Sequence, residues 1–99
     1  MSYFLNIKCM FKIIYSDLVK QDLIEISNFI SIDNPFYATK VVGYLTRSID
    51  ILKIYPLLWK ERRWWIREII DNKYKYRIFY KINWKNIYII SIFKYKNIF

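Results

Sequence analysis

The sequence predicts a two-layer α+β domain: an N-terminal strand, a helical hairpin and then a three-stranded antiparallel meander. Apolar residues recur with a helical period over residues 18–30 and again over 38–55, whereas strand-like runs fill residues 74–82 and 86–93. The chain has 99 residues, of which one is glycine and two are proline, so there is room for one core but little for long irregular loops. Residues 1–99 are therefore expected to form a single domain.

The first expected element is a strand over residues 11–15, which Met10 opens and which is rich in isoleucine and aromatic side chains. Residues 1–9 precede this strand. They are either a dispensable extension of the domain or a first strand that lengthens the next one. The sequence leaves both alternatives open.

A helix is expected next, from Ser16 to about Ser31. Ser16 is a suitable N-cap, and Asp17 supplies a negative charge in the first turn, where the helix dipole favours it. Its apolar positions follow the helical period: Leu18, Val19, Leu23, Ile26, Phe29 and Ile30.

A second helix is expected after a short polar link. Asn34 suits the N-cap, and Pro35 suits the first helical position, where its missing N–H is not needed. The apolar stripe lasts to Tyr55 and is ended by Pro56. Its members are Ala38, Val41, Val42, Leu45, Ile49, Ile51 and Leu52. Two helices with so short a link should form an antiparallel hairpin.

The rest of the chain is expected to supply three strands that are antiparallel neighbours. Its segments are a basic connector at 59–63, strands at 64–70, 74–82 and 86–93, and polar turns at 71–73 and 83–85. The first strand must join these three at one edge of the sheet, and the sequence does not say which edge.

The most informative segment is the strand at 74–82, because its alternation separates two kinds of side chain. One side carries Tyr74, Tyr76, Ile78, Tyr80 and Ile82. The other side carries Lys75, Arg77, Phe79 and Lys81. We expect the first side to pack on the helices and the second to present cations and an aromatic ring to an anionic partner.

The distribution of charge agrees with a basic surface in the C-terminal part. Residues 1–59 hold six cations and five anions, whereas residues 60–99 hold eleven cations and three anions. Codon usage rich in A and T explains many lysines, but not their segregation. The charge therefore indicates a basic binding surface. The alternative is a solvated face that keeps an aromatic-rich protein soluble.

Composition also argues against several kinds of site. Histidine is absent and Cys9 is the only cysteine, so the usual general base, the commonest metal ligand and an internal disulfide are missing. We expect neither a metal nor a cofactor. No uncharged apolar stretch approaches the roughly 20 residues of a membrane-spanning helix, and Lys8 and Lys12 interrupt the N-terminal apolar run too early for a signal peptide. A cytoplasmic protein is expected.

Several segments, taken together in their order and spacing, carry a resemblance to a known family. They are Phe11–Ser16; Leu18, Asp22, Leu23, Ile26, Phe29 and Ile30; Asn34, Pro35 and Ala38; Ile49, Leu52, Tyr55 and Pro56; Ile66–Ile69; Tyr76–Ile82; and Ile87–Ile92. From about Met10 to Lys96 the chain resembles the ParE/RelE superfamily, the toxin halves of bacterial type II toxin–antitoxin pairs. Its extended Asn-Pro helical hairpin looks more like the ParE branch.

This resemblance implies a toxin that a cognate antitoxin neutralises by wrapping a C-terminal segment around it. ParE-like members poison DNA gyrase by binding, which is the expected function here. The alternative is a RelE-like endoribonuclease that cuts messenger RNA on the ribosome without a metal. A third reading is a non-toxic remnant of the family that only binds the antitoxin. A homodimer or a toxin–antitoxin hetero-oligomer is compatible with each reading.

The match to the ribonuclease branch is partial. Arg77 matches the arginine on the central strand of RelE-like enzymes, and Lys94 and Tyr95 lie near the arginine that follows their last strand. Residues 65–68, by contrast, offer no match to the paired lysines of the preceding strand. If the protein were a ribonuclease, Arg77, Lys94 and Tyr95 would be the catalytic candidates.

For the favoured binding function, the candidate residues form two sets. The candidates for contact with the target or the antitoxin are Arg67, Lys75, Arg77, Lys81 and Lys94. The candidates for apolar contact with the antitoxin are Phe36, Tyr37, Tyr44 and Phe79. Arg67 and Glu68 must point to opposite sides of their strand, and we favour a structural ion pair for Glu68.

Two further groups of residues have open interpretations. Lys60, Arg62 and Arg63 form either a mobile basic loop over a target or a solvated connector. The four tryptophans, Trp59, Trp64, Trp65 and Trp84, crowd the basic half. Aromatic rings among cations can stack on nucleic-acid bases. We favour the more frequent alternative, in which they fill a core or an interface.

Overall fold

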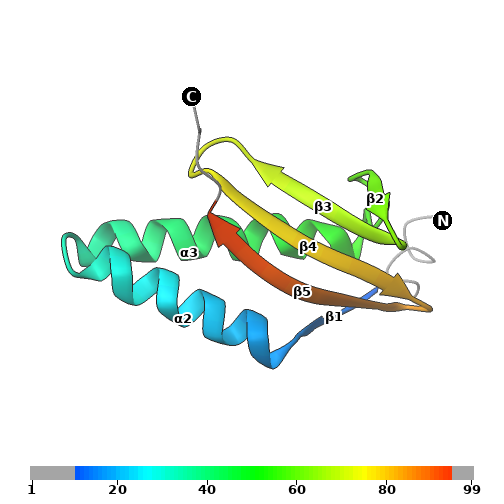
Figure 1. The fold of residues 1–99 in the computed structure, drawn as a ribbon, viewed down its shortest axis with the longest axis horizontal. Coiled ribbons are helices and arrows are strands. Elements are labelled where there is room, and N and C mark those ends of the chain that lie inside the picture. Colours follow the sequence, from blue (N-terminus) through cyan, green and yellow to red (C-terminus); the bar gives the residue numbers. More distant parts are fainter. Residues whose placement is uncertain (1–10, 95–99) are drawn as a thin grey trace, which may run out of the picture.

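The computed structural model describes residues 11–94, which form two helices, a short 3₁₀ turn and a five-stranded sheet (Figure 1). The elements are β1 (Lys12–Tyr15), α2 (Asp17–Ser31), α3 (Pro35–Asp50), the 3₁₀ turn η1 (Ile51–Lys53), β2 (Glu61–Arg63), β3 (Ile66–Asp71), β4 (Tyr76–Asn83) and β5 (Asn86–Lys94). The predicted α+β order of strand, helical hairpin and antiparallel strands is confirmed. Residues 1–9, whose role the sequence left open, lie outside the described part.

The strands are arranged in the order β1-β5-β4-β3-β2. The first strand therefore joins the sheet beside the last one, and it pairs with β5 in parallel, with Ile13 opposite Ile87. All other pairings are antiparallel. The connection from β1 to β5 includes both helices, and this places the helical hairpin over one face of the sheet (Figure 1).

Both helices begin at the predicted caps. The Ser16 hydroxyl accepts a hydrogen bond from the Val19 N–H at 3.1 Å, and the Asn34 side chain accepts one from the Tyr37 N–H at 3.1 Å. Each bond satisfies one of the donors that the first turn of a helix leaves without a partner. Pro35 occupies the first turn of α3, as expected.

The second helix is shorter than predicted, because its regular part ends at Asp50 and the 3₁₀ turn η1 continues to Lys53. The Lys53 carbonyl accepts a hydrogen bond from the Phe11 N–H at 3.0 Å. This bond ties the end of η1 to the start of β1, so the chain leaves the helix before Pro56 is reached. Proline also disfavours helical geometry in the residue that precedes it.

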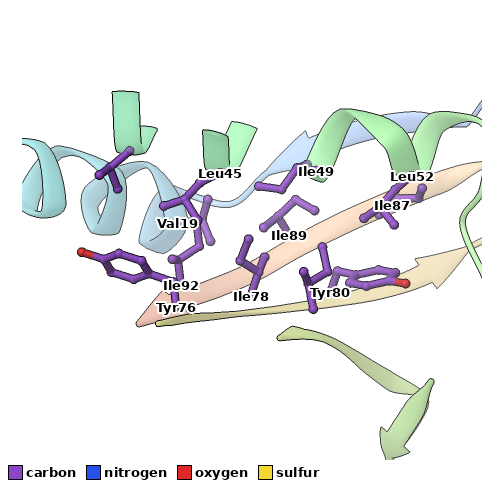
Figure 2. Packing of buried hydrophobic residues seen from close by; sticks show 12 residues of the cluster. Val19, Leu45, Ile49, Leu52, Tyr76, Ile78, Tyr80, Ile87, Ile89 and Ile92 are labelled. Atoms are coloured by element: carbon purple, nitrogen blue, oxygen red, sulfur yellow. The ribbon is translucent and has the colours of Figure 1, made fainter. Parts of the chain in front are cut away.

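The core lies between the helices and the middle strands (Figure 2). Fully buried apolar side chains come from both layers: Val19, Leu45, Ile49 and Leu52 from the helices and η1, and Ile78, Tyr80, Ile87 and Ile89 from β4 and β5. Each such aliphatic side chain contributes roughly 1.5–3 kcal/mol relative to exposure. The alternation predicted for 74–82 is therefore confirmed from Tyr76 onward, with Tyr76, Ile78 and Tyr80 on the helix side.

A bulge in β5 connects α2 to the sheet. The register shifts between Phe79 and Tyr80, so that Phe79 pairs with Ser91 and Tyr80 with Ile89. The Ser16 hydroxyl donates to the Ile90 carbonyl at 3.2 Å, and an Asp22 carboxylate oxygen accepts from the Ile92 N–H at 2.9 Å. Ser16 therefore bonds the extra residue Ile90, which a bulge leaves unpaired, and Asp22 bonds the backbone two residues further along β5.

Two segments of the C-terminal half differ from prediction. The expected connector at 59–63 contains a strand, β2, which pairs with β3 at one edge of the sheet, and residues 64–65 form the loop between them. Tyr74 and Lys75 lie in a turn rather than in β4. The cause is Asp71, whose carboxylate accepts hydrogen bonds from the backbone N–H groups of residues 73 and 74 at 2.9 and 3.0 Å and so extends the turn.

The three hairpin loops hold the four non-glycine residues of the described chain that have positive φ: Trp64 (57°), Trp65 (60°), Lys75 (67°) and Trp84 (59°). Two-residue hairpin loops favour positive φ because its twist matches that of the strands. A side chain in this region costs on the order of 1 kcal/mol, which glycine avoids. Three of these strained positions carry tryptophan.

Candidate functional site

The face of the sheet that the helices leave uncovered is the candidate site, and we refer to it as the open face. Paired residues of antiparallel strands point to the same side, so the register defines its members. They are Ile66, Glu68 and Ile70 from β3, Arg77, Phe79 and Lys81 from β4, and Tyr88, Ser91 and Phe93 from β5.

At the centre of this open face, two arginines flank a buried carboxylate. Glu68 is only 5% exposed, and its Oε1 accepts a hydrogen bond of 2.9 Å from Nε of Arg62. Its Oε2 lies 3.4 Å from Nε of Arg77, an ion pair without the alignment of a hydrogen bond. A buried carboxylate needs such partners because its desolvation is costly. The group, which we call the Arg–Glu–Arg triad, carries a net charge of +1.

An apolar hollow of about 370 Å³ adjoins the triad. Its lining consists of Arg62, Arg63, Trp64, Ile66, Phe79, Ile90 and Ser91. The ring of Phe79 also packs on that of Phe93, with centroids 5.4 Å apart. Cations therefore border an aromatic and aliphatic floor, which suits a partner that offers an apolar side chain together with an anion.

The structure brings together some of the predicted cations but not others. Arg77 and Lys81 share the open face. Arg67 points to the helix side, where its Nη1 donates to the Trp59 carbonyl at 2.6 Å. Lys94 pairs with Tyr76 and lies over its ring, 5.8 Å from the centroid, and Lys75 belongs to the turn before β4. The remaining ribonuclease candidate, Tyr95, lies outside the described residues.

The predicted apolar contacts are divided between the two sides of the molecule. Phe36 is 84% exposed and Tyr37 45% exposed on α3, and the rings of Tyr37 and Tyr44 both make edge-to-face contacts with the ring of Tyr74. Phe79 lies on the open face. A single partner segment must therefore pass round the sheet to touch both groups.

Sequence reasoning missed the part that Arg62 plays. The expected ion pair of Glu68 is present, but its partners come from β2 and β4, and the sequence did not indicate the first of these strands. The side to which Glu68 points was undecided as well. The Asx turn at Asp71 was the available signal, because a four-residue loop between Asp71 and Tyr76 sets the register and hence the face.

The four tryptophans differ in how far their side chains are exposed to solvent. Trp59 packs partly buried against the core. Trp64, Trp65 and Trp84 are 78%, 76% and 89% exposed. We expected the tryptophans to fill a core or an interface. Trp59 fills part of the core, whereas for the three exposed residues the interface role stays a prediction.

Burial shifts the pKa of three tyrosines among the described residues. Burial raises the pKa of Tyr80 above its ordinary value of 10.0, and the nearby Arg67 opposes this only in part. Burial likewise raises the pKa of Tyr76 and of Tyr15. These phenols stay protonated at neutral pH, so they are poor general bases.

Residues 11–94 lack two further features. Three or more histidine, cysteine or acidic side chains do not cluster anywhere in this range as they would around a metal ion. No helix within the same range has the length and apolarity that spanning a membrane requires.

Comparison with known proteins agrees with this geometry. Residues 13–99 match the family described as the ParE toxin of the type II toxin–antitoxin system parDE. No curated protein sequence matches the chain.

Solved structures show the same fold. A chain of the chromosomal ParDE toxin–antitoxin system from Pseudomonas aeruginosa superposes with a TM-score of 0.78 at 15% identity, covering 89% of this chain and 99% of that one. A chain of the RelBE2 toxin–antitoxin complex from Mycobacterium tuberculosis gives a TM-score of 0.60 at 17% identity, covering 87% and 99%.

Proposed function

The chain belongs to the ParE toxin family of type II toxin–antitoxin systems, and we propose from this that it stops growth by binding DNA gyrase through its open face. It acts in the cytoplasm, without chemistry of its own. A cognate antitoxin neutralises it by laying a segment across the open face and the α2–α3 hairpin.

One observation carries the choice of binding over RNA cleavage. Arg77, the residue that matches a ribonuclease arginine, has its Nε 3.4 Å from the buried carboxylate of Glu68. This guanidinium lies beside a negative carboxylate, which offsets part of the positive potential that it could offer to a transition-state phosphate. It is well placed, however, to present a fixed donor group to a protein surface.

The choice of antitoxin surface rests on charge and exposed apolar area. The cations of the open face are complementary to an acidic segment, and the hollow beside Phe79 can accept an apolar side chain. On the hairpin, Phe29, Ile32 and Phe36 are each at least 74% exposed. Exposed patches of this kind indicate a protein interface. An antitoxin segment that is both acidic and amphipathic satisfies both surfaces.

The test combines purified toxin with DNA gyrase and plasmid DNA. We expect supercoiling to be inhibited and cleaved DNA to accumulate, and we expect the addition of the antitoxin to reverse both effects. Induced expression should give a DNA-damage response while the transcriptome stays intact. The Arg77→Ala variant should lose the effect on gyrase, whereas Lys20→Ala, on the exposed surface of α2, should keep it.

Two other results would replace this proposal. Cleavage of messenger RNA on ribosomes, with no effect on gyrase, would identify a RelE-like endoribonuclease. Normal growth on induction, with the antitoxin still bound, would identify the non-toxic remnant.

A further inference from the structure

Three exposed tryptophans lie at one end of the sheet. Trp64 and Trp65 form the loop between β2 and β3, and Trp84 begins the loop between β4 and β5. The register places Ile66 opposite Lys81, so both loops lie at the same end of neighbouring strands, far from the α2–α3 loop (Figure 1). We refer to these two loops as the tryptophan end.

The choice of tryptophan at these positions is not explained by folding. All three residues have positive φ, a conformation that glycine or asparagine adopts more easily. Their side chains are at least 76% exposed, so they add little to the core. The A- and T-rich codon usage that explains many lysines and isoleucines does not explain tryptophan, whose one codon is UGG. Strained residues of this kind concentrate at functional sites.

The charge around these rings is positive. Exposed cations at this end are Lys12, Arg63, Lys81 and Lys85. Lys12 belongs here because its N–H donates to the Lys85 carbonyl at 2.8 Å. The nearby carboxylate of Glu61 accepts a hydrogen bond from the Trp65 N–H at 3.1 Å. The partner that complements this end is therefore anionic and has flat surfaces on which indole rings can stack.

We propose that the tryptophan end binds single-stranded nucleic acid, with unpaired bases stacked on Trp64, Trp65 and Trp84 and phosphates on the surrounding cations. Base–aromatic stacking combined with a basic surface is the usual mode of single-strand binding. This activity lies beyond the proposed binding of gyrase and does not depend on it.

Spacing favours a single strand over a duplex. The centres of the two loops are two strand spacings apart, roughly 10 Å. Stacked bases in a duplex follow one another at about 3.4 Å, so bases held by both loops must be splayed apart. A lipid surface is less well matched, because it takes up aliphatic side chains as well as aromatic ones, and these loops carry only tryptophan and lysine. The exposed Leu57 and Leu58 belong instead to the segment whose Pro56 carbonyl meets Tyr80 on the helix side.

The experiment follows tryptophan fluorescence of the full chain during titration with a 12-nucleotide oligo(dT) and, separately, oligo(rU). We expect quenching that saturates, with a log–log salt slope of roughly −2 to −3 for four cations. Binding of one oligonucleotide or of both supports the proposal and identifies the nucleic acid. An abasic oligonucleotide of equal length keeps the phosphates and should bind at least roughly 10-fold more weakly.

Asparagine variants separate stacking from folding, because asparagine tolerates positive φ. Trp64→Asn and Trp84→Asn should each weaken oligo(dT) binding by roughly 10-fold, as measured by fluorescence anisotropy of a labelled oligonucleotide. Trp59→Phe, at the partly buried tryptophan, should leave binding unchanged. Equal binding of the abasic control, or full affinity in both asparagine variants, would overturn the proposal. So would binding of anionic vesicles that depends on Trp64 and Trp84 when neither oligonucleotide binds.

Discussion

Nε of Arg62 donates a hydrogen bond of 2.9 Å to Oε1 of Glu68, and this bond connects the short edge strand β2 to the centre of the open face. A three-residue strand at an edge has few ladder bonds of its own. The ion pair therefore positions an arginine that would otherwise belong to a solvated loop. Arg77 contacts the same carboxylate from β4, with its Nε 3.4 Å from Oε2, so one carboxylate lies beside two guanidinium groups.

Neutralising this carboxylate should destabilise the protein. Glu68→Gln keeps the shape but removes the buried negative charge that Arg62 and Arg77 contact, and we expect the free energy of unfolding to fall by roughly 1–3 kcal/mol. Urea denaturation followed by circular dichroism measures this. Glu61→Gln is the matched control, because an amide oxygen can still accept the bond from the Trp65 N–H. An equal loss of stability in the two variants would mean that the triad contributes no more to folding than the exposed carboxylate of Glu61.

Removing Arg77 from β4 should abolish growth arrest while lowering the stability of the fold only slightly. Arg77 is 42% exposed, so Arg77→Ala removes a surface guanidinium at a modest cost in stability. We expect cells that express Arg77→Ala to grow almost normally, while Arg77→Lys keeps partial activity because it retains charge but not the planar fork. Growth curves at matched expression levels measure this. If a folded Arg77→Ala variant still arrests growth as fully as the wild type, the open face is not the surface that binds the target.

The cap of α2 should contribute more than an ordinary helical serine. Ser16 accepts a bond from the Val19 N–H and donates to the Ile90 carbonyl, so Ser16→Ala loses the cap and one of the bonds to the bulge. We expect destabilisation of about 1–2 kcal/mol. The control is Ser48→Ala within α3, where the hydroxyl only bonds back to the Tyr44 carbonyl. That change should be neutral or slightly stabilising in thermal unfolding, and the reverse ranking would contradict the capping argument.

Alkaline pH should destabilise the fold through its buried tyrosines. Burial raises the pKa of Tyr80 above 10.0 in the folded state, so the unfolded chain releases this proton first as the pH rises. The unfolded state then binds fewer protons than the folded state, and stability decreases above about pH 10. Tyr80→Phe should make this decrease shallower, although it loses the bond to the Pro56 carbonyl. Chemical denaturation from neutral pH to pH 11 measures the difference, and parallel curves would contradict it.

Relief of backbone strain should stabilise the protein at the turn before β4. Lys75 has a φ of 67°, which glycine adopts without a steric cost. We expect Lys75→Gly to raise the free energy of unfolding by roughly 0.5–1 kcal/mol. Lys73→Gly, in the same turn without a positive φ, serves as the control and should lower stability. A loss in both variants would show that the lysine side chain matters more than the strain.

Much of this fold was determined by short stretches of sequence acting locally. Ser16 and Asn34 begin their helices because a side-chain oxygen can reach a free N–H within three residues. Alternation over Tyr76–Ile82 divided β4 between core and open face because neighbouring side chains of a strand point to opposite sides. The sequence by itself therefore determined the order of the two helices and of four of the five strands, the face that carries Arg77 and Lys81, and the family.

The tertiary structure alone decided how these elements meet. It paired β1 with β5 in parallel, formed β2 from a segment that has no apolar period, and placed Arg67 on the helix side and Glu68 on the open face. Each of these outcomes depends on register and on groups far apart in the chain. Such contacts depend on which arrangement of the whole domain buries its apolar and polar groups with suitable partners. No window of a few residues contains that information.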